Sequence, residues 1–215
     1  MPAASQILDL DPETARTLIV TRRLLLRPAD VDDIPGLVRL INDPLIALST
    51  SRIPYPYAPI EGWRYLRAVG ADRSGPGISA GFLMTLRTNP RLIVGGAGFD
   101  WQPGFAPEIG YWVGAAHRRR GFAGEATRAL LARIFIHSSS TQIEAWCRVQ
   151  NIASQRVLKR AGFVRIGAGL RFSRSLGRYV RAIEFVLSRA DWLRRAGRDA
   201  SQAHFGRTES AFALK

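Results

Sequence analysis

The sequence predicts an α+β domain with one central sheet, and three observations lead to this prediction. The chain has 215 residues, of which 47% are hydrophobic, so it can bury one sizeable core and is not disordered as a whole. β-Branched and aromatic segments of strand length alternate with segments whose apolar residues recur at helical spacing. The expected order is strand, two helices, three strands, helix, strand, helix and two strands. We therefore expect a mixed, mostly antiparallel sheet of about seven strands, flanked by helices.

The N-terminal part of the domain is expected to form a strand and a helix. The segment TLIVTRRLLLRP at 17–28 is β-branched and apolar and ends at a proline, which predicts a strand. From Asp30 to Ile41 the apolar residues follow helical spacing behind candidate N-caps at Asp30 and Asp32, with Pro35 in the first turn.

An aromatic loop, a helix and three strands follow. The segment RIPYPYAP at 52–59 is too rigid for regular structure, and a helix is expected from Pro59 to about Arg73. A dipeptide typical of turns, Asn89-Pro90, is expected to join the first two strands into a hairpin. The three expected strands lie at 78–88, 91–99 and 107–114.

Helices and strands alternate in the second half of the chain. Asn151 is a candidate N-cap and Gly162 lies where a C-cap glycine is expected, so 151–163 is predicted to be a short helix. The other expected elements are a helix at 122–137, a strand at 142–149, two strands in FVRIGAGLRFS and RYVRAIEFVLS, and a closing helix in ADWLRRAG. The domain is then expected to span 17–194, with a leader at 1–16 and a mobile tail at 195–215.

Composition excludes several classes of protein. No apolar run is long enough to cross a bilayer, and the first residues lack the pattern of a signal peptide. Cys147 is the only cysteine, which excludes an internal disulfide and a cysteine metal cluster. No histidine has a convincing metal-binding partner, so no metal is expected. A cytoplasmic location is the default expectation.

The net charge of +14 raises the question of a nucleic-acid partner. It arises from 31 basic and 17 acidic residues, but 29 of the basic residues are arginines spread along the chain. A GC-rich genome explains this preference for arginine equally well. Nucleic-acid binding is therefore not expected, and local charge clusters are the better evidence.

The most informative cluster is AAHRRRGFAGEATRALL, which runs from Ala115 to Leu131. It lies between an expected strand and the start of an expected helix, where unpaired backbone N–H groups and the helix dipole favour an anion such as phosphate. Gly121 and Gly124 allow the backbone to approach the anion closely, and the preceding arginines add donors. The alternative is a solvated arginine run before a helix start.

The spacing of this cluster resembles a known family. Arg118-x-x-Gly121-x-Ala123 matches the Q/R-x-x-G-x-G/A signature of the GNAT acetyltransferases. The segments EIGYWVGAAHRRRGFAGEATRALL and NIASQRVLKRAGF resemble EIGYW…RGKGYATEA and N-x-A-S-x-R-V-L-E-K-x-G-F of the RimJ/RimL-like branch, which acetylates ribosomal-protein N-termini. The resemblance extends from about 17 to 194, and Lys159-Arg160 departs from an acid–base pair of many relatives.

The resemblance implies acetyl-CoA as the co-substrate and a set of residues that bind it. The strand EIGYWVG would splay from its neighbour and hold the pantetheine arm and the acetyl carbonyl through its backbone; otherwise it is an ordinary core strand. The residues implied by the resemblance are Tyr111, Trp112 and Val113 for the arm, and Arg118, Arg119, Arg120, Gly121, Phe122, Ala123 and Gly124 for the diphosphate.

The resemblance also implies the residues that assist the chemistry. Asn151 and Ser154 would contact the pantetheine arm and the sulfur, although an N-cap with its usual partner explains the same pattern. Many GNAT enzymes place a tyrosine further along this helix, but here the region reads Val-Leu-Lys. Ser154 is therefore the expected hydrogen-bond donor to the departing thiolate, and Cys147 is expected to be a buried structural thiol.

Glu108 begins the splayed strand and is the expected base that takes a proton from the amine. The alternative is a glutamate paired with one of the many arginines, and Glu144 and Asp100 are weaker candidates for the base. The aromatic residues Tyr55, Tyr57 and Trp63 would form a wall of the acceptor site or, equally, a small core under a long loop.

These expectations define an acetyl-CoA-dependent N-acetyltransferase. An acetyl group would pass to a primary amine by direct attack in a ternary complex, with a protein N-terminus as the favoured acceptor. A small amine acceptor, such as a polyamine, an antibiotic or an amino acid, and a non-catalytic acetyl-CoA sensor are the alternatives. The oligomeric state is open between a monomer and a homodimer.

Overall fold

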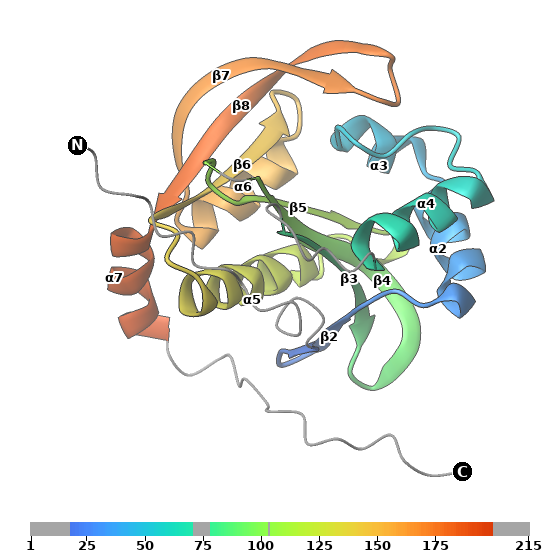
Figure 1. Ribbon diagram of the computed structural model, residues 1–215, viewed down its shortest axis with the longest axis horizontal. Helices are drawn as coiled ribbons and strands as arrows, with labels where there is room; N and C mark the ends of the chain where they lie inside the picture. The colour runs from blue at the N-terminus through green and yellow to red at the C-terminus, as the bar shows by residue number, and fades with distance from the viewer. Residues whose placement is uncertain (1–17, 71–77, 103, 200–215) are drawn as a thin grey trace.

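The computed structural model describes residues 18–70, 78–102 and 104–199, which form eight strands in one sheet (Figure 1). The strand order is β1-β2-β3-β4-β5-β6-β8-β7, and every neighbouring pair is antiparallel except β5 and β6, which are parallel. The mixed, mostly antiparallel sheet is thus confirmed. The strands are β1 (Ile19–Val20), β2 (Leu24–Arg27), β3 (Ile78–Leu86), β4 (Asn89–Trp101), β5 (Glu108–Val113), β6 (Gln142–Arg148), β7 (Val164–Ser173) and β8 (Arg178–Ser188).

Helices cover both faces of the sheet (Figure 1). Along β3, the side chains of Phe82 and Met84 enter the larger core with α5, whereas Leu83 enters a second cluster with α2 and α3. This alternation places a core on each face because successive strand residues point to opposite sides. The helices are α2 (Ile34–Ile41), α3 (Pro44–Ser49), α4 (Pro59–Gly70), α5 (Phe122–His137), α6 (Ile152–Ala161) and α7 (Arg189–Asp199), with short 3-10 turns at Val31–Asp33 and Ala115–His117.

Local capping signals account for several helix boundaries. The Asp30 side chain accepts a hydrogen bond from Asp32 N–H, and Asp33 reaches back to the Asp30 N–H at 2.8 Å, forming a capping box. Asn151 caps α6, and Gly162 ends it with a φ of 105°, as the sequence predicts.

Three local predictions were wrong. The strand expected at 17–28 is divided into β1 and β2, because Thr21 bonds both the N–H and the C=O of Leu24 and closes a tight turn. This division gives eight strands rather than about seven. The β3–β4 turn lies at 87–88, and Asn89 already pairs with Leu86. Helix α3 was missed; it has six residues and depends on the Asp43 cap.

Both ends of the expected domain lie close to the limits of the described residues. Helix α7 continues to Asp199, past the expected domain boundary at residue 194. The leader at 1–16 lies outside the described residues, as do 200–215 of the tail and the end of the helix expected to reach Arg73.

The feature that positions the site is a gap between β5 and β6. The parallel ladder joins them at two residue pairs, Glu108–Glu144 and Ile109–Ala145, and pairing ends there. On its other side β5 pairs with β4 over six residues, and Gly114 N–H continues this ladder to Val94 C=O at 3.0 Å. Because backbone groups alternate along a paired strand, those of Tyr111 and Val113 point away from β4 and into the gap.

Candidate functional site

The arginine–glycine segment forms a left-handed turn at the start of α5. Arg119 has a φ of 62° and Gly121, the N-cap, a φ of 81°. The first helical hydrogen bond runs from Glu125 N–H to Gly121 C=O at 3.1 Å, so the amides of residues 122–124 precede it and have no partner within the helix. Such amides at the positive end of a helix dipole form an anion site.

The three arginines before Gly121 differ in their surroundings. Arg118 donates from Nε to Val113 C=O at 3.2 Å and pairs through its terminal nitrogen with Asp43 at 2.5 Å, which ties the turn to β5 and to α3. The side chains of Arg119 and Arg120 are exposed. The structure therefore gives Arg118 contacts within the protein and leaves the other two guanidinium groups accessible to an anion.

Residues Phe122, Ala123 and Gly124 form the first turn of α5. The Phe122 ring is buried in the larger core, and Ala123 and Gly124 are partly buried. On β5, Tyr111 and Val113 pack against this same core, whereas the Trp112 side chain packs against the second cluster. These side chains are thus used for packing, and only the backbone of Tyr111 and Val113 faces the gap.

Ser154 lies where α6 approaches β5. Its Oγ is 2.9 Å from the Tyr111 phenol oxygen, and its N–H donates to Asn151 Oδ1 at 3.0 Å. Burial raises the pKa of Tyr111 far above its ordinary value, with the Ser154 hydrogen bond acting in the opposite direction. Burial also raises the pKa of the Cys147 thiol to about 11, again against the effect of Ser154. Cys147 is therefore a protonated, buried thiol at neutral pH, which argues against transfer of an acetyl group through an acetyl-cysteine intermediate.

Glu108 lies on the opposite face of β5 from Tyr111, because the two residues are three positions apart along the strand. Its carboxylate accepts a hydrogen bond from Arg171 at 2.8 Å and lies 3.7 Å from the terminal nitrogen of Arg52. The side chain is 26% exposed, so it is accessible from solvent. The weaker candidates also have partners: Asp100 pairs with Arg52 at 2.8 Å, and Glu144 accepts from a glutamine side chain at 3.3 Å.

The predicted aromatic wall separates into exposed and buried members. Tyr55 and Trp63 are 48% and 45% exposed, whereas Tyr57 is 5% exposed and belongs to the second core cluster. Burial raises the pKa of Tyr57 to about 12, with a smaller contribution from the charge on Glu61. For Tyr57 the alternative of a small core under a loop is the one the structure supports.

Several site residues were not found from the sequence. Asp43, Arg52 and Arg171 contact Arg118 or Glu108 from segments far away in the chain. Asp43 carried a usable signal, because an aspartate before a proline is a common helix start. No signal in the sequence singles out Arg52 or Arg171 among the other arginines.

The described residues also bear on metals and membranes. Within residues 18–70, 78–102 and 104–199, no group of three or more His, Cys, Asp or Glu side chains is arranged to hold a metal ion. In the same part of the chain, no helix combines the length and apolar character that crossing a membrane requires.

Comparison with known proteins places the chain in a family. The model of the acetyltransferase (GNAT) domain matches residues 23–164. An uncharacterized N-acetyltransferase, p20 of Bacillus licheniformis, is 26% identical over 81% of this chain and 97% of its own length. A second, YjdG of Bacillus subtilis, is 35% identical over 34% of this chain, and the match spans 44% of YjdG.

Solved structures agree with this assignment at the level of the fold. Mycobacterium smegmatis RimJ, in complex with CoA-disulfide, is 18% identical with a TM-score of 0.72, over 88% of this chain and 97% of RimJ. The Salmonella typhimurium acetyl transferase that modifies the N-terminal serine of ribosomal protein L7/L12 is 21% identical with a TM-score of 0.68. The match covers 80% of this chain and 99% of the Salmonella protein. Since the family model covers well over half of the chain, this protein belongs to the GNAT acetyltransferases.

Proposed function

We propose that this protein is an acetyl-CoA-dependent N-acetyltransferase that acetylates a primary amine. The observation that carries the proposal is the continuity between the left-handed turn at Gly121 and the gap beside β5. Arg118 links the two directly, because it belongs to the turn and donates to the Val113 carbonyl at the edge of the gap. Membership of the GNAT family and the complex of RimJ with CoA-disulfide both support acetyl-CoA as the co-substrate.

The residues present fit the coenzyme. Residue 121 needs a left-handed backbone, which favours glycine, and the amides of 122–124 provide donors of the kind that bind a diphosphate. The backbone of Tyr111 and Val113 would hold the pantetheine arm in the gap and supply a donor for the acetyl oxygen as its negative charge grows. When bound, the coenzyme supplies an acetyl thioester, whose carbonyl carbon is the atom that the amine nitrogen would attack.

Glu108 and Ser154 would serve the two proton requirements from opposite faces of β5. A protonated amine cannot attack, so Glu108 would accept its proton, either directly or through water. Ser154 would donate a hydrogen bond to the sulfur as the carbon–sulfur bond breaks, and Tyr111 and Asn151 hold Ser154 in place. This separation favours direct attack in a ternary complex, because the base would act on the amine from one face of β5 and the donor on the sulfur from the other.

The favoured acceptor is a protein N-terminus. The Salmonella typhimurium enzyme, described as modifying the N-terminal serine of a ribosomal protein, supports this choice by its similar fold. Exposed Tyr55 and Trp63 would provide aromatic surface for an amine and the residues behind it. A cytoplasmic location goes with such an acceptor and stays a prediction.

The test measures binding and turnover separately. Calorimetry should detect binding of acetyl-CoA to the purified protein. Release of free thiol should then be followed with N-terminal peptides, polyamines and amino acids as acceptors. Turnover with peptides above the other amines supports the proposal, and turnover with small amines alone would replace the acceptor. Binding without turnover on any acceptor would support a sensor, and absence of binding would overturn the proposal.

A further inference from the structure

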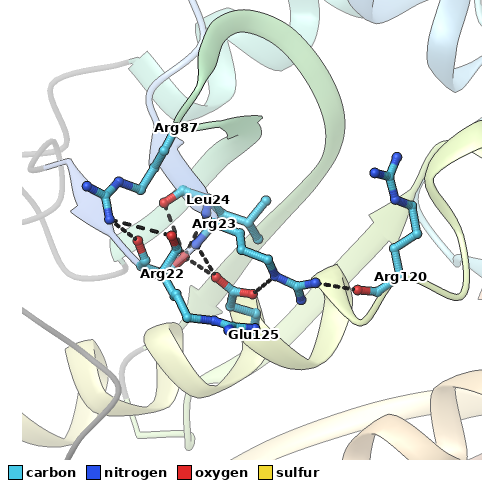
Figure 2. A network of polar contacts seen from close by, with 7 residues as sticks. Arg22, Arg23, Leu24, Arg87, Arg120 and Glu125 are labelled. Carbon is cyan, nitrogen blue, oxygen red and sulfur yellow. Dashed lines mark hydrogen bonds and ion pairs between the residues drawn. The ribbon is translucent and has the colours of Figure 1, made fainter.

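A buried carboxylate lies directly behind the left-handed turn (Figure 2). Glu125, on the first turn of α5, is 8% exposed and faces the tight turn between β1 and β2. It accepts hydrogen bonds from Thr21 Oγ1 at 2.6 Å, from Arg23 N–H at 2.8 Å and from Arg23 Nε at 2.7 Å. One side chain of α5 is therefore held by two residues from the N-terminal edge of the sheet.

The charge on Glu125 is stabilised by these donors. Burial alone would raise the pKa of the carboxyl group, but the hydrogen bonds from Thr21 and Arg23 outweigh it, and the pKa lies below its ordinary value. Glu125 is thus ionised at neutral pH and orients the Arg23 guanidinium group.

The rest of the Arg23 guanidinium group contacts the turn. Its Nη1 donates to the Arg120 carbonyl at 2.8 Å (Figure 2). The group also lies 4.9 Å from the centre of the Phe122 ring. A Cβ atom added to Gly121 would lie 3.2 Å from Nη2, which is a tight contact. Arg23 therefore contacts Arg120 and Phe122, and it leaves little room for a side chain at Gly121 between them.

The Arg23 bond to Arg120 and the first hydrogen bond of α5 fix the directions of two backbone amides. In a trans peptide the C=O and the following N–H point in opposite directions. Arg23 holds the Arg120 carbonyl, so the Gly121 N–H points away from Arg23. The Glu125 N–H donates to the Gly121 carbonyl as the first hydrogen bond of α5, so the Phe122 N–H points away from the Gly121 carbonyl and out of the helix end.

We infer that Arg23, oriented by Glu125, is a positioning residue for the diphosphate of the coenzyme. It acts through the turn, by aiming the Gly121 amide, rather than by supplying catalytic chemistry. This inference rests on the proposed function, because it requires that the turn binds a coenzyme diphosphate. It also explains why Arg23, 97 residues before Arg120 in the chain, has two of its guanidinium nitrogens bonded within the protein.

The experiment compares variants with two acetyl donors. Acetyl-CoA contains the diphosphate, whereas S-acetylpantetheine carries the same thioester without it.

The variants are Arg23→Ala, Arg23→Lys and Glu125→Gln. The matched control is Arg87→Ala, because the Arg87 guanidinium group donates to the Thr21 and Arg22 carbonyls of the same β1–β2 turn, at 3.2 and 3.5 Å, rather than to the Arg120 carbonyl. Calorimetry gives the Kd for CoA, kinetics give KM and kcat for each donor, and thermal unfolding gives stability.

Arg23→Ala should weaken CoA binding and raise the KM for acetyl-CoA about tenfold, the effect of losing one charged hydrogen bond. Turnover with S-acetylpantetheine should change less than twofold. Arg23→Lys should recover part of the affinity, and Glu125→Gln should lose affinity in the same direction. Arg87→Ala should lower the melting temperature and leave CoA affinity unchanged.

Two results would overturn the inference while leaving the proposed function intact. One is wild-type CoA affinity in a folded Arg23→Ala variant. The other is an equal loss with both donors, which would indicate general damage to the fold. Failure of the wild-type protein to bind CoA at all would instead remove the proposed function, and this inference with it.

Discussion

The phenol oxygen of Tyr111 on β5 lies 2.9 Å from Oγ of Ser154 on α6, in the region where β5 has parted from β6. The Ser154 backbone is fixed as well, because its N–H donates to Asn151 Oδ1 at 3.0 Å. With its backbone fixed and its hydroxyl bonded to Tyr111, the Ser154 side chain is oriented before any ligand arrives.

Ser154→Ala should lower kcat about a hundredfold, because the departing sulfur loses its donor, while Kd for CoA changes little. Tyr111→Phe keeps the ring packing and removes only the phenol oxygen, so kcat should fall by a smaller factor. Steady-state kinetics with calorimetry provide the measurement. A Ser154→Ala variant with wild-type kcat would assign the donor to another group.

Gly121→Ala should weaken CoA binding at least tenfold. A β-carbon at a φ of 81° is strained by about 1–2 kcal/mol and would approach the Arg23 guanidinium group. Gly177→Ala is the matched control, since Gly177 also has a positive φ, of 60°, but no atom within 4 Å of an added Cβ. Both variants should lose stability, and only Gly121→Ala should lose affinity in calorimetry. Equal affinities would contradict the role of the turn.

Glu108→Gln should lower kcat about a hundredfold and leave the KM for acetyl-CoA nearly unchanged, because the base acts on the amine rather than on the coenzyme. Asp100→Asn serves as the control, since Asp100 shares Arg52 with Glu108 and lies on the neighbouring strand. Initial rates with a fixed peptide acceptor measure both. A larger loss in Asp100→Asn than in Glu108→Gln would move the base to Asp100.

Glu125 should make the protein sensitive to acid. Its pKa is lowered in the folded state, so the unfolded chain binds the proton first as the pH falls. The stability that Glu125 contributes is complete above its unfolded pKa, about 4.3, and is lost as the pH falls through that value toward the folded pKa. Glu125→Gln should destabilise the protein by about 1–3 kcal/mol at pH 7.

Urea unfolding of wild type and Glu125→Gln from pH 7 to pH 3 tests this sign. The difference in free energy of unfolding should stay constant down to about pH 5 and shrink below about pH 4. A difference that grows on acidification would mean that the folded carboxyl group has a raised pKa.

Local signals in the sequence predicted the parts of the site that depend on local structure. The N-cap Asn151, the C-cap Gly162 and the turn at Gly121 lie where expected, because each is determined by neighbouring residues. The contacts that complete the site join distant segments: Arg23 and Glu125 are 102 residues apart, and Arg171 and Glu108 are 63 apart. With 29 arginines available, only the fold determines which one meets which carboxylate.

The same limit explains the errors in the fold. Segment 17–28 has the composition of one strand, and the side-chain bonds of Thr21 that divide it are not visible as a hydrophobic pattern. For Tyr57 the sequence allowed a wall of the acceptor site and a small core equally, and the structure packs it with Leu37 of α2 and Leu83 of β3. Burial of a loop residue depends on elements far away in the chain.

The parting of β5 from β6 also has a thermodynamic consequence. The eight strands form two antiparallel blocks, β1–β5 and β6–β8, whose backbone ladders meet at only two residue pairs. Besides these pairs, the blocks are joined by the packing of α5 against α6 beneath the sheet and by side-chain contacts such as the Arg171–Glu108 pair. A ligand bound in the gap between β5 and β6 would contact both blocks. Saturating coenzyme should therefore sharpen the calorimetric melting transition as well as raise its midpoint.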